Sequence, residues 1–412
     1  MKLGDTLSLP KGWELKKLGE VCDFQNGFAF KSNTYKETGL PILRITNIQN
    51  QTLELNNLVY FNVKDYKENF DRFKVFKDDL VVAMSGATTG KLGINNTDTV
   101  FYLNQRVGKF IPKKEILKPY LYYFLSTKVE ESLKIAAGAA QPNLSTEQIN
   151  SFEIPLPPLP EQQRIVAILD EAFAAIAKAK ANAEQNLKNA KELFESYLQG
   201  VFENKGEGWE EKTLGEVCSL ITDGKHGDCD NEENSGFYFL SAKNVKNGTL
   251  LFEEGRQITK KGFEETHRRT NLMPGDICMV NTGATIGRIS FAPDDHRTFK
   301  STFQKSVAVI KTIPSLINND FCCYILKSDL KKLVKVSSGS AVPNLLLGDL
   351  KKHLINIPSS LNHQQTIVEK LDALSIETKK LEAVYQQKIN DLEELKKSVL
   401  QKAFSGELKT VI

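Results

Sequence analysis

The sequence predicts an α+β fold: two tandem mixed α/β domains separated by two long antiparallel coiled-coil helices, arising from an internal duplication with pseudo-twofold symmetry. Three observations predict it. A long stretch with helical hydrophobic spacing occurs twice, shorter motifs recur in the same order, and strand-like segments precede each long stretch. With 412 residues, of which 41% are hydrophobic and 25% charged, the chain can form two or three folded domains.

The two long stretches cover 160–202 and 362–404. Apolar or small residues recur along each at alternating steps of four and three, which is the seam of a coiled coil. Asn186 and Lys388 interrupt the seam at the same place, and an apolar residue follows each, so we expect a shared one-residue shift of the stripe. The expected seam positions are Ile165, Leu169, Ala172, Ile176, Ala179, Ala183, Ala190, Leu193 and Tyr197, then Ile367, Leu371, Leu374, Leu381, Tyr385, Leu392, Leu395 and Val399, with polar Thr378 also on the seam.

Neither stripe can be buried by its own helix, which would be about 55 Å long at ~1.5 Å per residue. We therefore expect the two helices to pair antiparallel, with a globular domain at each end. The alternative is that each helix packs separately on its own domain. Equal length, an equal seam and the shared shift favour mutual pairing.

Shorter motifs show that the duplication extends over both halves, with copies about 200 residues apart. The segments between them, 25–75 and 221–270, share little beyond Asn47 and Asn244. One scaffold thus carries two different surfaces, which predicts a protein that recognises two different things at a fixed separation. The recurring motifs are KGWELKKLGEVC (11–22) with EGWEEKTLGEVC (207–218), MSGATTGK (84–91) with NTGATIGR (281–288), GAAQPNL (138–144) with GSAVPNL (339–345), and QQRIV (162–166) with QQTIV (364–368).

Within each half we expect short strands and then helices. β-branched and aromatic residues predict strands at 41–48 and 237–245, and buried strands at 78–86 and 275–283 run into glycine turns. Helical spacing marks 119–137 and 319–336. Proline-rich 154–160 is expected to be a stiff, extended lead into the first long helix. The predicted domains are 1–160, a spacer helix 161–203, a second domain 204–361 and a C-terminal helix 362–412.

Composition narrows the class of protein. No apolar run approaches the roughly 18 residues of a membrane span, and the N-terminus has no apolar signal segment, so we expect a cytoplasmic protein. None of the six cysteines has the CxxC spacing, which indicates reduced, mostly buried thiols. Because the net charge is only +3, a nucleic-acid surface must be a local patch.

The recurring glycine turn is a candidate contact with a phosphodiester backbone. GATTGK has three residues between its glycines where a Walker loop has four, and the second copy ends in Arg288, so ATP binding is not expected. Hydroxyls, turn amides and a cation suit a DNA phosphate, whereas the alternative is a purely structural tight turn. The candidates are Thr88, Thr89 and Lys91 in the first copy and Thr282, Thr285 and Arg288 in the second.

A second polar motif and the variable segments supply the remaining candidates. Asn104-Gln105-Arg106 and Phe303-Gln304-Lys305 recur, and glutamine can read adenine and arginine guanine through paired hydrogen bonds. The alternative is an ordinary exposed strand edge. HRR at 267–269 is the densest basic cluster, with a solvated charge run as its alternative. The candidates in the variable segments are Lys31, Arg44 and Asn47, then Lys225, His226, Lys243, Asn244, Arg268 and Arg269.

Catalytic motifs are missing from the sequence. It contains no NPPY-like or FxGxG-like methyltransferase motif, no HExxH, no GxSxG and no zinc-ligand spacing. We therefore expect no catalytic residue, no metal site and no cofactor bound by this chain.

These motifs together resemble the specificity (S) subunits of type I restriction-modification systems. The resemblance rests on the WxxxxLGEVC segment, the GATxGK/R turn, IPLPPLPEQQRIV and the terminal SVLQKAFSGEL, and it covers both halves. One departure is IPSSLNHQQ in the second half, which leaves its partner contact and its domain–helix angle in doubt.

The resemblance implies two target-recognition domains, each reading one half of a split double-stranded DNA site. Two recognition units related by a pseudo-twofold must meet the duplex on one face, which requires half-sites about one helical turn (roughly 34–36 Å) apart. It also implies two modification subunits that methylate adenine, and restriction subunits that join them. S-adenosylmethionine, ATP and Mg²⁺ are then expected on those partners, and the S subunit itself is not catalytic.

Two other classes remain open from the residues alone. One is a self-contained DNA-modifying enzyme or ATPase, which nucleotide or cofactor binding by the isolated chain would support. The other is a coiled-coil adaptor without nucleic acid. Retention of a split duplex that weakens steeply with salt would separate the specificity subunit from the adaptor.

Overall fold

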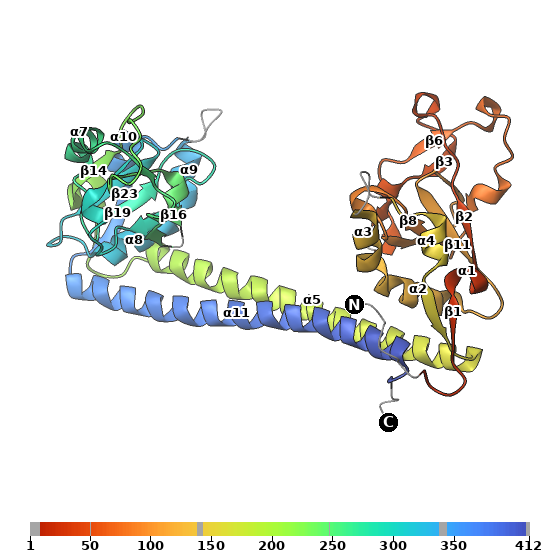
Figure 1. Ribbon diagram of the computed structural model, residues 1–412. Coiled ribbons are helices and arrows are strands. Elements are labelled where there is room, and N and C mark those ends of the chain that lie inside the picture. Colours follow the sequence, from red (N-terminus) through yellow and green to blue (C-terminus); the bar gives the residue numbers. More distant parts are fainter. Residues whose placement is uncertain (1–8, 50, 138–142, 247, 338–343, 409–412) are drawn as a thin grey trace. The chain divides into compact units, whose positions relative to one another are not determined.

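The chain folds into two compact units, each containing a mixed α/β domain and a segment of both long helices (Figure 1). The computed structural model describes residues 9–49, 51–137, 143–246, 248–337 and 344–408. Unit 1 comprises Met1–Glu184 with Gln387–Ile412, and unit 2 comprises Gln185–Gln386. Residues 1–8 at the N-terminus and most of the repeated motif at 138–144 and 339–345 lie outside the described residues.

Unit 1 contains a six-stranded sheet in the order β2-β11-β8-β9-β5-β4, a four-stranded sheet in the order β6-β3-β10-β7, and the pair β1-β12. Most pairs are antiparallel, but β3 with β10 and β5 with β9 are parallel. The strands are β1 (Glu14–Lys17), β2 (Cys22–Asn26), β3 (Leu40–Leu43), β4 (Ile48–Gln49), β5 (Gln51–Leu53), β6 (Val59–Phe61), β7 (Lys74–Val75), β8 (Leu80–Ala83), β9 (Leu92–Ile94), β10 (Phe101–Leu103), β11 (Val107–Pro112) and β12 (Glu153–Leu156). The α-helices before the first long one are α1 (Leu18–Val21), α2 (Lys118–Thr127), α3 (Val129–Ala137) and α4 (Thr146–Asn150).

Unit 2 repeats this plan with sheets in the orders β14-β22-β19-β20 and β18-β15-β21 and the pairs β13-β23 and β16-β17. Its β15 and β21 are parallel, like β3 and β10 in unit 1. The strands are β13 (Trp209–Thr213), β14 (Cys218–Asp223), β15 (Tyr238–Leu240), β16 (Val245–Lys246), β17 (Thr249–Leu250), β18 (Arg256–Gln257), β19 (Ile277–Val280), β20 (Ile289–Phe291), β21 (Ser301–Phe303), β22 (Val307–Thr312) and β23 (Leu354–Pro358). The α-helices are α6 (Leu214–Val217), α7 (Lys260–Thr270), α8 (Asn319–Ser328), α9 (Leu330–Ser337) and α10 (Leu347–Lys352).

The long helices α5 (Leu159–Glu203) and α11 (Leu361–Ser405) pair antiparallel, as the sequence predicts. In unit 1 the beginning of α5 shares a core with the end of α11, where Ile165 and Leu169 pack with Leu400 and Ala403. In unit 2 the end of α5 and the beginning of α11 contribute Leu198, Val368 and Leu371 to one core. Each helix therefore buries its stripe against the other and against a domain.

The predicted shift of the stripe is present, but four predicted seam residues are exposed. Leu187 and Ile389 are half-buried after the interruptions at Asn186 and Lys388, as expected for the shift. In α5 the buried stripe then continues through Ala190, Phe194 and Leu198, two successive steps of four. The predicted continuation was therefore wrong at Leu193 and Tyr197, which are 50% and 43% exposed. The predicted seam of α11 was also wrong at Leu381 and Leu395, which are 42% and 47% exposed.

Two predicted strands and the predicted extended lead differ in part in the structure. The predicted strand 237–245 forms β15 and then the 3-10 helix η6 (Ala242–Asn244) before β16. The segment 41–48 forms β3 and then a 3-10 helix, η2 (Ile45–Asn47), because the Asn47 side chain accepts a hydrogen bond from the Arg44 N–H and turns the chain. Residues 154–156 of the proline-rich lead belong to β12 and pair with β1, but the last two residues of the lead already belong to α5. A proline in the first turn is compatible with a helix because the N–H it lacks has no intrahelical partner there.

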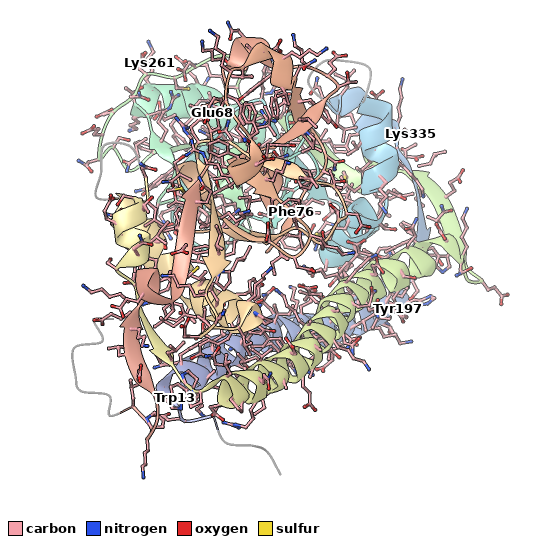
Figure 2. The ribbon with its side chains drawn as sticks, turned by 90° about the vertical axis from the view of Figure 1, so that its right-hand side faces the viewer. Trp13, Glu68, Phe76, Tyr197, Lys261 and Lys335 are labelled. Atoms are coloured by element: carbon pink, nitrogen blue, oxygen red, sulfur yellow. The ribbon has the colours of Figure 1, made fainter. Side chains whose placement is uncertain are left out.

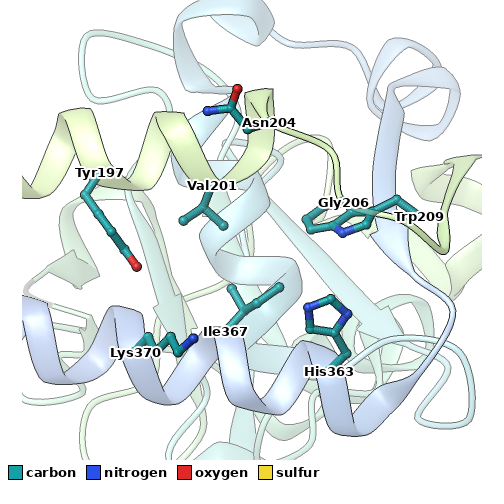
Figure 3. A pocket seen from close by; sticks show the side chains of 8 residues that line it. All are labelled: Tyr197, Val201, Asn204, Gly206, Trp209, His363, Ile367 and Lys370. Carbon is teal, nitrogen blue, oxygen red and sulfur yellow. The ribbon is translucent and has the colours of Figure 1, made fainter.

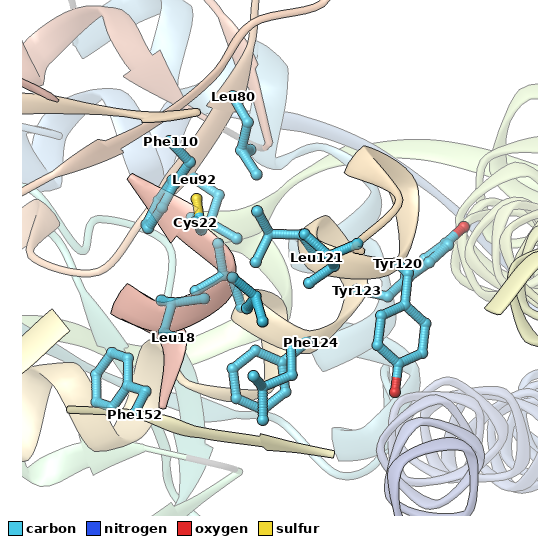
Figure 4. Packing of buried hydrophobic residues seen from close by; sticks show 14 of the residues in the cluster. Leu18, Cys22, Leu80, Leu92, Phe110, Tyr120, Leu121, Tyr123, Phe124 and Phe152 are labelled. Carbon is cyan, nitrogen blue, oxygen red and sulfur yellow. The ribbon is translucent and has the colours of Figure 1, made fainter. Parts of the chain in front are cut away.

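The main core of unit 1 joins the sheets to the long helices (Figure 4). Helix α2 lies between them and buries Tyr120, Leu121 and Phe124. Trp13 packs against the same core (Figure 2). All six cysteines are free and buried, and within the described ranges no helix is long and apolar enough to cross a membrane.

Candidate nucleic-acid interface

In unit 1 the turn at 104–106 holds the ends of three other segments through backbone hydrogen bonds. It connects β10 of the four-stranded sheet to β11 of the six-stranded sheet, and both are interior strands. These bonds bring the starts of the loops at 27–31, 44–47 and 84–91 next to the turn at 104–106. In each bond the N–H of the first residue donates to the carbonyl of the second: Asn104 to Leu43 (3.0 Å), Met84 to Arg106 (2.9 Å), Phe28 to Leu103 (2.8 Å) and Gly27 to Val107 (3.1 Å).

Unit 2 contains the same four bonds at equivalent positions. They run from the N–H of Gln304 to the carbonyl of Leu240 (2.9 Å), Asn281 to Ser306 (3.0 Å), Lys225 to Phe303 (2.8 Å) and Gly224 to Val307 (3.3 Å). Asn104 therefore corresponds to Gln304, Gln105 to Lys305 and Arg106 to Ser306. The sequence alignment that paired 104–106 with 303–305 was wrong by one residue.

Two glycines that sequence reasoning missed make this framework possible. A Cβ atom on Gly27 would lie 2.0 Å from the carbonyl oxygen of Asn104, and one on Gly224 would lie 1.9 Å from that of Phe303. Because both obstacles are backbone atoms, no side chain fits at either position. Their recurrence in the two halves was the signal that could have identified them.

The predicted interface residues fall into three groups by exposure. Only Thr89, Asn47 and Asn244 are buried. The half-buried ones are Arg44, Thr88, Lys225, Thr282, Thr285 and Gln304. The exposed ones are Lys31, Lys91, Gln105, Arg106, His226, Lys243, Arg268, Arg269, Arg288 and Lys305.

The glycine turn after β8 uses one of its threonines internally. Thr89 is fully buried, and its hydroxyl donates to the carbonyl of Gly86 at 2.7 Å. The Thr88 hydroxyl lies 3.5 Å from the Ser85 carbonyl oxygen and is half-buried. Lys91 is exposed at the end of the turn. The turn therefore presents a cation, with one hydroxyl partly accessible beside it.

The equivalent turn after β19 follows the same plan. Gly287 has a φ of 86°, and a Cβ there would lie 2.0 Å from the Leu330 side chain, so glycine is required. The Thr282 hydroxyl donates to Oδ1 of Asn344 at 2.7 Å, which occupies it within the fold. Arg288 is exposed where Lys91 lies in unit 1.

Asn47 and Asn244, the pair shared by the two variable segments, have a structural role. Each is 2% exposed. Asn47 accepts from the Arg44 N–H (3.1 Å), and Asn244 accepts from the Ser241 N–H (2.9 Å). Asn244 also donates to the carbonyl of Leu251 (3.0 Å). Both amides thus fold their own loops, and we leave them out of the interface proposed below.

The basic cluster of unit 2 is organised around one buried carboxylate. Asp223, at the end of β14, is 6% exposed. Arg269 donates to its carboxylate (2.5 Å) and to its carbonyl (2.9 Å), and His226 lies 3.1 Å from the same carboxylate. Arg268 is exposed in the last turn of α7, where the helix dipole favours a cation. Arg269 and His226 are therefore held in place, while Arg268 extends into solvent.

Unit 2 also has a small hollow of about 240 Å³ where α5 ends and α11 begins (Figure 3). The His363 ring lies 6.5 Å from that of Trp209, edge to face. Among the described residues, no cluster of histidine, cysteine or acidic side chains could hold a metal ion. The residues lining the hollow are Tyr197, Val201, Asn204, Gly206, Trp209, His363, Ile367 and Lys370.

Comparison with known proteins gives one consistent family. The family model described as type I restriction modification DNA specificity domain matches residues 10–188 and again 206–393. The putative type I restriction enzyme MjaX specificity subunit of Methanocaldococcus jannaschii is 25% identical over 430 residues, 97% of this chain and 95% of the relative. The EcoBI specificity subunit of Escherichia coli is 25% identical over 431 residues, 98% and 87% of the two chains.

Solved structures share the fold. A chain from a type I R-M system, solved to study complex assembly and conformational transition, has a TM-score of 0.77 at 20% identity, covering 97% of this chain and all of that one. The HsdS subunit from Thermoanaerobacter tengcongensis has a TM-score of 0.62 at 20% identity and covers 99% of this chain. With two copies of the matching domain across nearly its whole length, this chain belongs to the type I restriction-modification DNA specificity family.

Proposed function

We propose that this chain is the DNA specificity subunit of a type I restriction-modification system and recognises a bipartite target, one half-site through each unit. The observation that carries the proposal is the repeated framework of four backbone bonds. It presents different side chains at equivalent positions: Gln105 against Lys305, and Arg106 against Ser306. Because the backbone framework is the same in both units, both can dock on DNA in the same way. Because the polar side chains differ, each unit can read a different base sequence.

In unit 1 the turn residues Gln105 and Arg106 read base edges, and Lys91 contacts a phosphate. Both turn residues are exposed, and glutamine and arginine form paired hydrogen bonds with adenine and guanine in the major groove. Thr88, Lys31 and Arg44 lie on the neighbouring loops and extend the polar surface.

In unit 2, Lys305 takes the position of Gln105, half-buried Gln304 reads bases beside it from the position of Asn104, and Arg288 takes the phosphate position. The side chains of Lys225, Lys243, Arg268 and Thr285 supply further contacts. Asp223 pairs with Arg269 and lies against the His226 ring, so these two contribute mainly by shaping the loop after β14.

The subunit has no catalytic role of its own and directs partners to the target. Two modification subunits bind it, because the duplication offers two equivalent helix-and-domain surfaces to copies of one partner. Restriction subunits join that complex in the cytoplasm. S-adenosylmethionine, ATP and Mg²⁺ belong to these partners, and this chain binds no cofactor.

Mapping modified adenines in the source genome tests the proposal directly. We expect a split motif with two defined halves and a fixed gap, which disappears when this gene is deleted and returns when it is restored. Adenine methylation that is unchanged by the deletion, or that follows an undivided motif, would refute it. Removing one heptad from both α5 and α11 should change the permitted gap and leave both half-sites intact.

A further inference from the structure

A buried glutamine fixes the first long helix to the domain that precedes it. Gln162, in the first turn of α5, is fully buried. Its Oε1 accepts from the N–H of Leu117 (2.8 Å), and its Nε2 donates to the carbonyls of Glu115 and Pro157 (both 2.9 Å). These three bonds tie the helix to the loop before α2 and to the end of β12.

Unit 2 contains the same clamp despite a different lead-in. Gln364 is fully buried, accepts from the N–H of Asn318 (2.8 Å), and donates to the carbonyls of Leu316 (3.2 Å) and Pro358 (2.9 Å). Glutamine and proline are 6 positions apart here and 5 apart in unit 1. The second lead-in therefore has one extra residue between the proline and the glutamine, and all three hydrogen bonds are still formed.

A second contact fixes each helix about two turns farther along. Tyr123 of α2 donates to Oδ1 of Asp170 at 2.5 Å, and Tyr324 of α8 donates to Oδ1 of Asp372 at 2.5 Å. Burial and the aspartate together raise the pKa of both tyrosines, so each hydroxyl keeps the proton it donates. In each unit the two fixed points lie about 12 Å apart along the helix at ~1.5 Å per residue. Two attachments at this spacing resist tilting as well as sliding.

We propose that Gln162 and Gln364, with their tyrosine–aspartate contacts, are positioning residues that set the gap between the two half-sites. The inference rests on the proposed function, because a gap has meaning only for a bipartite target. Each clamp fixes the angle of one domain on its own helix. A tilt of about 10° moves a point about 20 Å from the joint by about 3.5 Å, which equals the rise of ~3.4 Å per base pair. A loosened joint should therefore accept a gap that is one base pair too long or too short.

The test compares Gln162→Leu with Gln163→Leu, its exposed neighbour in the same QQ pair. Binding is measured on duplexes carrying both half-sites at the native gap and at gaps one base pair longer and shorter. Gln162→Leu should reduce the preference for the native gap at least fivefold, leave discrimination within each half-site unchanged, and differ from Gln163→Leu. Tyr123→Phe removes a single hydroxyl, so it tests the same joint if Gln162→Leu does not fold. An unchanged gap preference in folded Gln162→Leu or Tyr123→Phe overturns the inference.

A second measurement is independent of DNA. Spin labels are placed in unit 1 at Lys67→Cys on the domain and Glu171→Cys on α5, both exposed positions, while the native cysteines are buried. Gln162→Leu should broaden the distance distribution between the labels, and Gln163→Leu should not. A wild-type protein that binds no split duplex would refute the proposed function. A distance distribution as narrow in Gln162→Leu as in wild type would refute only the positioning role of Gln162.

Discussion

Replacing Gln105 by alanine should change which bases unit 1 accepts without weakening its fold. The side chain is exposed, and backbone bonds from Asn104 to Leu43 and from Met84 to Arg106 hold its turn. The truncation should therefore change the free energy of unfolding by less than about 0.5 kcal/mol. A paired hydrogen bond to adenine contributes about 1–3 kcal/mol of discrimination. Preference for the native base should then fall roughly 5- to 150-fold at one position of one half-site.

Asn47→Ala is the matched control, because the same sequence reasoning nominated both residues. The Asn47 amide is buried and bonds the N–H of Arg44 and the carbonyls of Glu54 (3.3 Å) and Asn56 (3.4 Å). Its loss leaves these groups unpaired and should lower the free energy of unfolding by about 1–3 kcal/mol. It should weaken binding to all duplexes alike.

Competition binding against duplexes altered at each position, with urea unfolding in parallel, separates the two variants. Gln105→Ala should shift the preference at one base while its unfolding midpoint stays in place. If Gln105→Ala weakened all duplexes equally, or affected both half-sites, the assignment of base reading to the 104–106 turn would be wrong.

Three further predictions concern phosphate contact, acid stability and packing. Lys91→Ala should weaken binding to every duplex and lower the slope of log K against log salt by about 0.9, measured by titration at several salt concentrations. Burial acts to raise the pKa of Asp329, but hydrogen bonds, chiefly with His353 at 3.0 Å, lower it overall. The ionised Asp329 carboxylate therefore stabilises the fold above its unfolded pKa of about 3.9, and this stabilisation is lost as pH falls through the lower folded pKa. Asp329→Asn should lose less free energy of unfolding than wild type across that pH range, measured by urea titrations at several pH values. Phe404→Ala removes the ring contacts with Tyr120 (5.2 Å between centroids) and Phe124 (5.6 Å) and should lower the free energy of unfolding by about 2–4 kcal/mol. Leu193→Ala, at a position that is 50% exposed, should lower it by less than about 0.5 kcal/mol, and urea unfolding measures both.

The long helices were predictable because their signal is periodic and long. Nine positions in the first stretch and eight in the second repeat the heptad spacing, so single exceptions such as Asn186 cannot hide it. What the period could not decide is which of two neighbouring stripes is buried after the interruption. Leu193 and Phe194 both fit a heptad step, and packing against the domain selects Phe194, which lies with its ring centroid 6.3 Å from that of Tyr324.

The candidate interface was only partly accessible to sequence reasoning. Residue type identifies exposed cations such as Lys91 and Arg288, and whether they contact DNA stays a prediction. Residue type cannot show that Asn47 is buried, because its partners depend on how the variable loop closes on itself. The alignment of the 104–106 turn failed for a related reason: insertions fall inside the domains, and only long-range backbone bonds fix the register.

Unit 1 takes its final residues from the far end of the chain. Leu400 and Ala403 belong to its main core and Phe404 packs against it, although all of unit 2 is translated before them. The first domain to leave the ribosome is consequently the last to be completed. A premature stop late in the gene would therefore leave the core of the N-terminal domain incomplete. The truncated product would be open to proteolysis in that domain, even though the stop codon lies at the other end of the gene.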